Sequence, residues 1–370
     1  MNTAGTDPPG TRDRDDLIAS YEFELPEHLI AQRPLAERSA ARLLVLRAGA
    51  VGPEHRQVRE LPELLTRGDL LVVNDTSVLP ARLYGEKAGT GGRVELLLVR
   101  PEPAASTWIC LLNASKRPRP GTRLVFGTGS AHSLDAFFAT MEGAVDDEPG
   151  AFRVRFEGDA RAFARSFGHV PLPPYIARDD DDDDLARYQT VFADADKAAS
   201  SAAPTAGLHF DAALLAALTE RGVRTARVTL HVGPGTFLPM RGERLSEHPM
   251  HPEPWSVPEE SARLVEETRR AGGRVIAVGT TSLRALEASA AETGAVRAGA
   301  GLTRLFLRPP QRPRVVDALF TNLHLPGSTL FALVCAVAGR ERMQAAYAEA
   351  IATGYRFYSY GDASFLEVQR

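Results

Sequence analysis

From Arg224 to the C-terminus, segments with the apolar spacing of helices alternate with segments that have the spacing of strands. In residues 227–232, apolar side chains alternate with polar ones, which predicts a strand with one buried face. Residues 275–278 form a short apolar strand that turns directly into a helical segment ending near Glu287. Further helices are predicted over residues 258–270, 328–339 and 340–353, and a further strand over 315–320. This alternation predicts a sheet covered by helices, an α/β layer.

A different pattern occupies residues 82–165, where short β-type runs are separated by turns rich in Gly and Pro. Such runs are typical of a small β-barrel or sandwich. The predicted fold class is therefore α/β, with a large α/β domain formed by residues 21–81 and 166–370. A small β-barrel domain over residues 82–165 interrupts it. Residues 1–20 are polar and charged, and we expect them to be a disordered leader.

Length and composition narrow the class of protein. A chain of 370 residues favours about two domains, and 44% hydrophobic residues suffice for a sizeable core. The longest strongly apolar run, Leu330–Ala338, is far shorter than the roughly 20 residues of a membrane helix. The two cysteines, Cys110 and Cys335, lie far apart in apolar surroundings, which predicts buried free thiols. We expect a protein of the reducing cytoplasm with no membrane partner.

Net charge does not decide between classes of partner. The formal net charge is −4, but six acids form the single run Asp179–Asp184, and without them the balance would be +2. We expect that run to be a solvated loop. Basic residues are partly clustered, among them Arg304, Arg308, Arg312 and Arg314.

Two polar stretches have the composition of ligand-binding segments. The first is Asn74-Asp75-Thr76, which follows an apolar strand and leads to Arg82. Open α/β sheets bind ligands where strands end, although an Asx turn would give the same pattern. The second stretch contains Thr205, Gly207 and His209 ahead of a helix capped by Asp211. Small residues there allow a ligand to approach backbone N–H groups, although a structural role is the favoured interpretation for His209 taken alone.

The segment after residue 230 joins a histidine to a glycine-rich turn. His231 lies on the polar face of its predicted strand, and Gly233, Gly235 and Thr236 follow it. A dinucleotide-binding motif is rejected because no helix opens after the glycines. A close approach of the backbone to a ligand is still expected here.

Hydroxyl groups gather where residues 275–278 turn into a helix. Thr280, Thr281 and Ser282 lie at the positive end of that helix, and Arg284 follows. This arrangement favours an anion, either a carboxylate or a phosphate. The alternative is a simple Thr or Ser helix cap.

A last cluster is expected at the end of the strand predicted over residues 315–320. Asp317, Asn322 and His324 follow one another closely in the sequence, and the alternative is a capped loop with a packed histidine. His248 and His251 have a spacing that can hold zinc on a helix, but the neighbouring prolines argue against a helix. No metal site is predicted.

In this order, the stretches resemble the S-adenosylmethionine:tRNA ribosyltransferase-isomerases of queuosine biosynthesis. The resemblance covers nearly the whole chain from about Tyr21, and the ordered set of motifs is highly specific. It also includes the runs Tyr21–Pro26, Ile30–Pro34, Gly68–Val72, Pro80–Leu83, Gly168–Ile176, Tyr188–Val191 and Ser359–Ala363. It implies a large α/β domain interrupted by a β-barrel. One departure is Ser77, where the family usually has Arg or Lys.

The activity that the resemblance implies is transfer and isomerisation of the ribosyl unit of S-adenosylmethionine. The acceptor is the 7-aminomethyl-7-deazaguanine at the tRNA wobble position, and the products are epoxyqueuosine-tRNA, adenine and methionine. S-adenosylmethionine is then a co-substrate, and no permanently bound cofactor is expected. The partners are this tRNA and S-adenosylmethionine, and the protein is expected to be a monomer.

Residue roles follow from the resemblance and from the chemistry of histidine. We expect His231 and His324, with Asp317, to supply base, acid and orientation, and His209 is a further catalytic candidate. Residues 280–282 are expected to hold the methionine carboxylate or a tRNA phosphate. The four arginines between residues 304 and 314 are expected to follow tRNA phosphates, the alternative being a solvated basic loop.

Two other functions stay open. A paralogue would transfer the ribosyl unit to a free nucleobase or small metabolite. A catalytically silent RNA-binding protein would bind tRNA without consuming S-adenosylmethionine. The dense His, Asp and Thr residues at strand ends argue against the silent protein, because phosphate binding relies on Lys and Arg.

Overall fold

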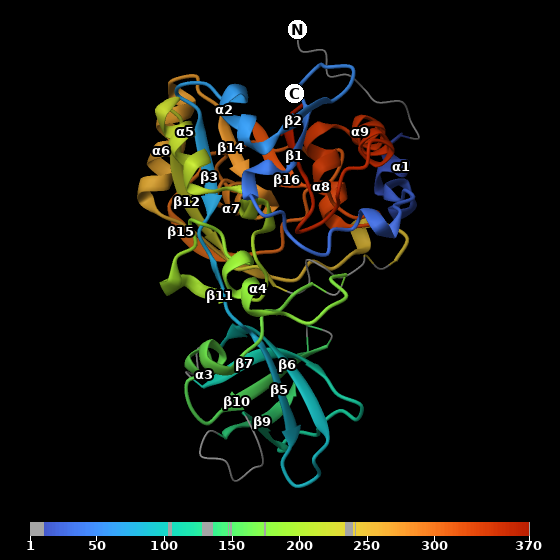
Figure 1. Ribbon diagram of the computed structural model, residues 1–370, viewed down its shortest axis with the longest axis vertical. Coiled ribbons are helices and arrows are strands. Elements are labelled where there is room, and N and C mark those ends of the chain that lie inside the picture. The colour runs from blue at the N-terminus through green and yellow to red at the C-terminus, as the bar shows by residue number, and fades with distance from the viewer. Residues whose placement is uncertain are drawn as a thin grey trace.

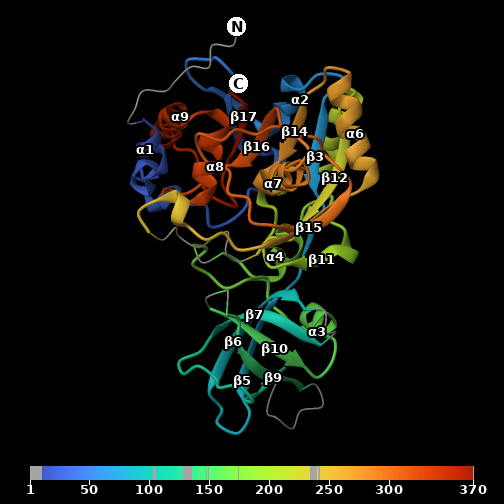
Figure 2. The same cartoon turned by 180° about the vertical axis from the view of Figure 1, so that it is seen from behind.

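The computed structural model describes residues 11–102, 106–127, 136–146, 148, 150–173, 175–233, 240 and 242–369. Within these ranges the chain forms a nine-stranded sheet with helices packed on it and a closed six-stranded barrel. In Figures 1 and 2 the barrel hangs below the sheet, and α4 (Asp182–Arg187) and β11 (Ala198–Ser200) lie between the two. The predicted fold class is confirmed, while the domain boundaries at residues 81/82 and 165/166 stay a prediction.

The large sheet has four parallel strands at its centre. These are β12 (Arg224–Leu230), β3 (Leu70–Asn74), β14 (Val275–Val278) and β16 (Ala318–Asn322), which neighbour one another in that order. Outer strands complete the sheet as β15 (Gly299–Thr303) and β13 (Glu253–Val257) on one side and β17 (Ala363–Glu367), β1 (Arg42–Leu46) and β2 (Glu54–Gln57) on the other. The carboxyl ends of the four parallel strands therefore meet at one edge.

Burial on both faces explains why β3 is continuously apolar from Leu70 to Val73. Leu70 and Val72 of β3 belong to one buried cluster, whereas Leu71 and Val73 belong to another on the opposite face. Side chains alternate between the two faces of a strand, so a strand buried on both sides favours apolar residues at every position. Such burial contributes about 25 cal/mol for each Å² of apolar surface.

Helices cover both faces of the sheet. The first cluster contains residues of α6 (Glu259–Arg270), α7 (Gly279–Ser289), α8 (Thr329–Ala338) and α9 (Arg340–Ala352). The second contains residues of α2 (Leu61–Leu64) and α5 (Ala212–Glu220). The helices predicted over residues 258–270, 328–339 and 340–353 are confirmed within one residue at each end. The strand predicted over 315–320 lies later, as β16.

The barrel consists of antiparallel strands in the order β10-β7-β6-β5-β8-β9. Their bounds are Arg82–Lys87 for β5, Arg93–Pro101 for β6, Thr107–Asn113 for β7, Arg123–Phe126 for β8, Phe137–Ala144 for β9 and Ala151–Phe156 for β10. Leu96, Trp108 and Val154 are among the residues of its core, which α3 (Ala160–Phe167) joins through Phe163. Closing the sheet into a barrel removes unpaired strand edges.

Two predictions about charged segments need correction. The leader predicted over residues 1–20 is wrong for its second half, where α1 (Thr11–Asp16) forms and Asp15 pairs with Arg340 at 2.7 Å. The solvated loop predicted for the acidic run is wrong for Asp184, which is buried in α4 and accepts hydrogen bonds from Arg178 and Tyr360. Successive helical residues face different directions, so one of the six acids turns inward.

Simple expectations about the cysteines and the apolar run have clear outcomes. Cys110 and Cys335 are both free and buried, as predicted. Among the described helices, none has both the length and the apolar character that spanning a membrane requires.

Candidate active site

Four chemistry-bearing segments converge on one edge of the sheet because they directly follow the four parallel strands. Asp75-Thr76 follows β3, His231 follows β12, Gly279–Thr281 follows β14, and His324 lies two residues beyond β16. The carboxyl edge of such a sheet is where open α/β folds bind ligands. The segments are up to about 250 residues apart in the sequence, and only the parallel topology brings them together.

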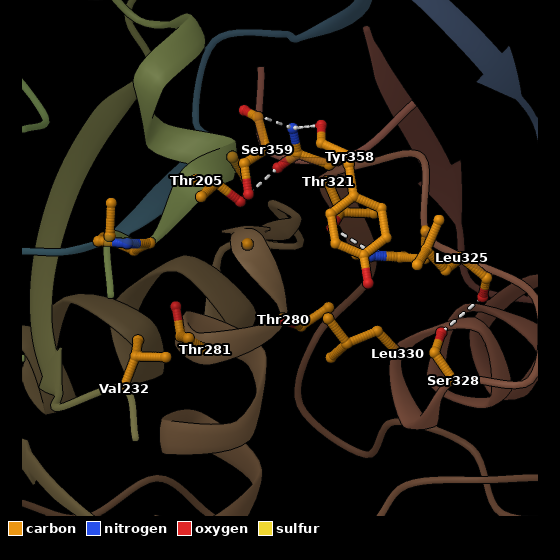
Figure 3. A pocket seen from close by; sticks show the side chains of 16 residues that line it. Thr205, Val232, Thr280, Thr281, Thr321, Leu325, Ser328, Leu330, Tyr358 and Ser359 are labelled. Carbon is orange, nitrogen blue, oxygen red and sulfur yellow. Dashed lines mark hydrogen bonds between the residues drawn. The ribbon is translucent and has the colours of Figure 1, made fainter. Parts of the chain in front are cut away.

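A pocket of about 600 Å³ opens at this edge, and we call it the main pocket. Its wall consists of Ala203, Pro204, Thr205, Ala206, Val232, Gly279, Thr280, Thr281, Thr321, Asn322, His324, Leu325, Ser328, Leu330, Tyr358 and Ser359. None of these described residues is an Asp, Glu, Lys or Arg. The main pocket is thus lined by hydroxyl, amide and imidazole groups and by apolar side chains, as Figure 3 shows.

Asn322 ties three parts of the wall together. Its side-chain oxygen accepts a hydrogen bond from Thr205 at 2.9 Å, and its amide nitrogen donates to the backbone oxygens of Tyr358 at 3.0 Å and Ser359 at 3.4 Å (Figure 3). Tyr358 has a φ of 75°, a left-handed conformation that costs a bulky residue about 1–3 kcal/mol. Asn322 therefore stabilises a strained turn and places Tyr358 and Ser359 in the wall.

His324 is a neutral imidazole in the wall of the main pocket. Its Nε2 lies 3.0 Å from the hydroxyl of Thr321, and its backbone N–H donates to the hydroxyl of Tyr347 at 3.0 Å. Complete burial lowers the pKa of His324 from 6.5 to about 3, because burial disfavours the charged form. At neutral pH the ring can exchange hydrogen bonds with a ligand but carries no charge.

The N-terminus of α7 presents two of its three predicted hydroxyl residues to the main pocket. Thr280 and Thr281 line the pocket, whereas the hydroxyl of Ser282 donates to the backbone oxygen of Val278 at 2.8 Å inside the helix. The buried hydroxyl of Thr281 has no hydrogen-bond partner among the described residues. Gly279 has a φ of +86°, which permits the sharp turn from β14 into α7. The prediction for Ser282 as a ligand-facing hydroxyl is therefore wrong.

His231 lies beside the main pocket rather than in its wall. Its neighbour Val232 lines the pocket, and adjacent side chains of an extended chain face opposite sides. The Nδ1 atom of His231 lies 2.8 Å from the hydroxyl of Thr76, which is also 2.8 Å from the hydroxyl of Ser200. The other ring nitrogen, Nε2, has no hydrogen-bond partner among the described residues. Thr76 thus orients the ring and leaves one nitrogen available.

Charged groups around His231 favour its neutral form. Burial lowers the pKa of His231, and the nearby cations Arg161 and Lys197 act in the same direction, against the opposing effect of Asp75. Asp75 itself is fully buried, pairs with Lys197 at 2.5 Å and accepts a hydrogen bond from Thr229 at 2.7 Å. Lys197 thereby places a cation beside Asp75, two residues before Ser77. Asp75 therefore has a structural partner on each side.

The predicted cluster of Asp317, Asn322 and His324 is wrong, because the strand boundaries differ from those expected. Asp317 precedes β16, at the opposite end from Asn322, and its carboxylate accepts a hydrogen bond from the backbone of Val275 at 2.9 Å. Five strand residues separate the two ends by about 16 Å. The structure therefore does not bring Asp317 to the main pocket.

Two candidates in the stretch that precedes α5, His209 and Gly207, have packing roles. His209 is buried, and its ring nitrogens lie 3.2 Å from the backbone oxygen of Ala206 and 3.0 Å from that of Gly361. Burial lowers the pKa of His209, so the structural interpretation is favoured. A Cβ atom on Gly207 would lie 2.6 Å from Phe192, so this glycine is required for packing.

The remaining binding candidates lie away from the wall. Arg82, in β5, donates to the backbone oxygen of Leu172 at 3.1 Å. The backbone N–H of Gly233 donates to Glu253 at 3.1 Å, and the buried guanidinium of Arg284 pairs with the same carboxylate. Gly233, Glu253 and Arg284 line an adjoining pocket of about 480 Å³ that shares Leu330 with the main pocket. The predicted contributors Gly235 and Thr236 lie outside the described residues.

Three of the four predicted tRNA-binding arginines have partners within the described part of the protein, and the fourth, Arg304, is exposed. Arg308 lies 3.4 Å from Asp16, Arg312 donates to the backbone oxygen of Gln369 at 2.8 Å, and Arg314 donates to that of Ala291 at 3.4 Å. Arg304 acts electrostatically on Glu148 of the barrel segment. Their contact with tRNA stays a prediction.

Comparisons of the sequence and of the structure with known proteins point to the same family. A sequence profile described as queuosine biosynthesis protein matches residues 18–366. An S-adenosylmethionine:tRNA ribosyltransferase-isomerase of Anaeromyxobacter sp. (strain K) is 51% identical over 351 residues, covering 94% of this chain and 98% of that protein. One of Thiobacillus denitrificans is 50% identical over 351 residues, covering 95% and 97%. The crystal structure of an S-adenosylmethionine tRNA ribosyltransferase from Thermotoga maritima is 35% identical with a TM-score of 0.52, covering 94% of this chain and 99% of that one.

Proposed function

This chain belongs to the queuosine biosynthesis protein family, and we propose that its main pocket is the site of ribosyl transfer from S-adenosylmethionine to a base of tRNA. The protein transfers and isomerises the ribosyl moiety onto the 7-aminomethyl-7-deazaguanine at the wobble position. The products are epoxyqueuosine-tRNA, adenine and methionine. Identity of about 50% over nearly the whole length of relatives with this named activity carries the conclusion.

The chemistry requires groups that move protons near neutral pH. The sulfonium of S-adenosylmethionine acidifies the adjacent ribose C5′ proton, so that a modest base can remove it. Adenine leaves more easily when its ring receives a hydrogen bond or a proton, and the acceptor amine must be neutral to attack. A histidine with a lowered pKa is uncharged at pH 7 and can serve as such a base.

The two histidines at the sheet edge suit different steps. His231 is oriented through Nδ1 by Thr76 and has Nε2 available, which fits a general base. His324 lines the main pocket as a neutral ring, which fits a hydrogen-bond partner of bound S-adenosylmethionine. Asp317 is not part of this assignment because it lies at the far end of β16.

Two positive features lie near enough to receive the methionine carboxylate. One is the N-terminus of α7, and the other is Arg284 in the adjoining pocket. Arg284 is already neutralised by Glu253 and donates to the backbone oxygen of Leu305 at 3.0 Å. The helix end has no carboxylate among the residues of the main pocket, and helix N-termini favour anions by about 0.3–1 kcal/mol or more. We therefore assign the carboxylate to Thr280 and Thr281.

The Thr281→Val variant is expected to raise KM for S-adenosylmethionine about tenfold, while its melting temperature stays equal or rises. A buried hydroxyl without a partner costs about 1–3 kcal/mol, and valine removes it at nearly constant volume. A bound carboxylate would supply the missing partner, so its loss weakens binding. Steady-state kinetics and thermal unfolding give both quantities.

Ser282→Ala is the matched control for Thr281→Val. The Ser282 hydroxyl bonds within α7, so its loss should lower the melting temperature slightly and leave KM for S-adenosylmethionine unchanged. An unchanged KM in Thr281→Val would remove Thr281 from the binding site.

The proposed function is tested by adenine release from S-adenosylmethionine with purified protein. We expect release that depends on tRNA carrying the aminomethyl-deazaguanine base. Release with the free base or another small acceptor, but not with this tRNA, would instead indicate a paralogue with a different acceptor. Binding of tRNA without any release would indicate a catalytically silent RNA-binding protein. The monomeric state stays a prediction that light scattering of the same sample can check.

A further inference from the structure

A third pocket, of about 310 Å³, lies next to the main pocket and contains three arginines. We call it the arginine pocket. Arg38, Arg187 and Arg356 line it together with Tyr360, and Ser359 belongs to its wall and to that of the main pocket. The two pockets therefore lie on either side of Ser359.

The charges of Arg38 and Arg187 are not neutralised within the protein. Arg38 donates hydrogen bonds to the backbone oxygens of Leu208 and Ala186, each at 3.2 Å, and Arg187 donates to those of Leu35 and Ala36. Carbonyl groups satisfy the N–H donors but leave the positive charge in place. In the described part of the chain, neither arginine has a carboxylate within 4 Å, and no Asp or Glu lines the pocket.

The two arginines also repel each other. Burial lowers the pKa of Arg38, and the neighbouring charge of Arg187 lowers it further, against the effects of Tyr360 and Asp211. The Asp211 carboxylate already accepts hydrogen bonds from Ser39 at 2.6 Å and from the backbone of Leu214 at 2.8 Å. Adjacent like charges that are partly removed from water are costly, and a bound anion would offset that cost.

Arg356 adds a third guanidinium with unused donor capacity. Its Nη2 atom has no hydrogen-bond partner among the described residues, and Asp362 lies 3.9 Å away. That carboxylate accepts hydrogen bonds from the backbone N–H groups of Arg42 at 3.0 Å and Arg356 at 2.8 Å. Planar guanidinium groups match the geometry of phosphate oxygens and bind them through paired hydrogen bonds.

We propose that the arginine pocket binds a backbone phosphate of tRNA next to the nucleotide whose base enters the main pocket. This inference rests on the proposed function. The main pocket has no cation in its wall and suits the base and ribosyl unit, while the arginine pocket supplies the positive charge beside it. Contacts of this kind position a nucleic acid without reading its sequence. The arginines Arg38 and Arg187 differ from Arg308, whose charge is paired with Asp16.

The first experiment compares Arg187→Gln and Arg356→Gln with wild type. We expect each variant to lower kcat/KM for tRNA about tenfold at moderate salt and to leave KM for S-adenosylmethionine unchanged. Each lost phosphate contact also reduces the slope of log(kcat/KM) against log[salt] by about 0.7–0.9. Arg187→Lys keeps the charge and should restore most of the slope. The matched control is Arg270→Gln, an exposed arginine on α6 that pairs with Glu266, and it should match wild type.

The second experiment locates the phosphate. Anticodon stem-loops carry one neutral methylphosphonate linkage on either side of the wobble nucleotide. Wild type should lose affinity for one of these two substrates, and Arg356→Gln should show no further loss with it. Inorganic phosphate should not inhibit at millimolar concentration, and strong competitive inhibition would instead identify a site for free phosphate. Equal, additive losses in wild type and variant, or an unchanged salt slope, would overturn the proposal.

These measurements separate the inference from the proposed function. Adenine release by wild type tests the proposed function alone. If wild type releases no adenine, equilibrium binding of the same stem-loops to wild type and Arg356→Gln still reports whether the arginine pocket holds a phosphate.

Discussion

The His231→Ala variant is expected to lower kcat for tRNA-dependent adenine release by about 10²–10⁴-fold, the usual loss when a general base is removed. The ring has one nitrogen bonded to Thr76 and the other without a partner among the described residues. The side chain is half-buried at the end of β12, so its removal should change the melting temperature little. Single-turnover adenine release gives the rate, and thermal unfolding checks the fold.

The role of His231 as a base also predicts how kcat changes with pH. The base must be neutral, and burial together with Arg161 and Lys197 lowers the pKa of His231 below 6.5. In wild type, kcat should therefore be flat above pH 6.5 and fall only as the pH drops through the lowered pKa. The residual activity of His231→Ala should lack this acid limb. An acid limb centred above pH 6.5 would contradict the assignment.

Thr76→Val tests whether the ring must be oriented. The variant keeps the histidine but removes the hydroxyl that fixes Nδ1, so we expect a loss of about tenfold, smaller than for His231→Ala. Activity close to wild type in His231→Ala itself would show that the residue beside the main pocket takes no part in the chemistry.

The sequence predicts the fold well where apolar residues recur with the regular spacing of a strand or a helix. The continuous apolar run of β3 reflects a strand that is buried on both faces. The alternation in residues 227–232 predicts the strand β12, which pairs with the antiparallel strand β13 on its outer side. Gly and Pro turns likewise predict the short antiparallel strands that close the barrel. These patterns depend on local spacing, which the sequence contains directly.

Errors in the predicted site come from strand boundaries and from side-chain partners. A shift of three residues at the start of β16 moves Asp317 from the pocket to the opposite end of the strand. His209 and Gly207 have the composition of a binding segment, yet their neighbours Gly361 and Phe192 show that they serve packing. Neither partner is near in sequence, so no local pattern could have separated the two interpretations.

The parts of the site that sequence reasoning missed are brought in by single long-range contacts. Tyr358 and Ser359 reach the main pocket because Asn322 holds their backbone oxygens, although 36 residues separate Tyr358 from Asn322. Arg38 and Arg187 meet across 149 residues and share no motif. The resemblance of residues 359–363 to a family motif includes Ser359, but it gave that residue no role.

The His324→Gln variant is expected to lower kcat about 100-fold, comparable to removing one preorganised hydrogen-bond partner from an active site. Glutamine retains a side-chain amide near Thr321 and the main pocket, so the loss reports the imidazole rather than an empty cavity. Because the pKa of His324 is about 3, the ring does not titrate between pH 5 and 9, and the loss should be the same throughout that range. A loss that varies tenfold across it would contradict a neutral role.

The same residue makes a stability prediction whose sign follows from its pKa. The unfolded chain binds a proton on His324 below about pH 6.5, whereas the folded chain stays unprotonated until about pH 3. Acidification between these values therefore favours unfolding by roughly 1.4 kcal/mol for each pH unit. The His324→Gln variant cannot bind that proton, so its free energy of unfolding should fall less steeply with acidification than that of wild type. If the variant is less stable at neutral pH, the difference between the two proteins should therefore narrow toward pH 4. Gln substitution of the exposed His28 is the matched control and should follow wild type; parallel curves for His324→Gln would show that His324 is not held neutral by burial.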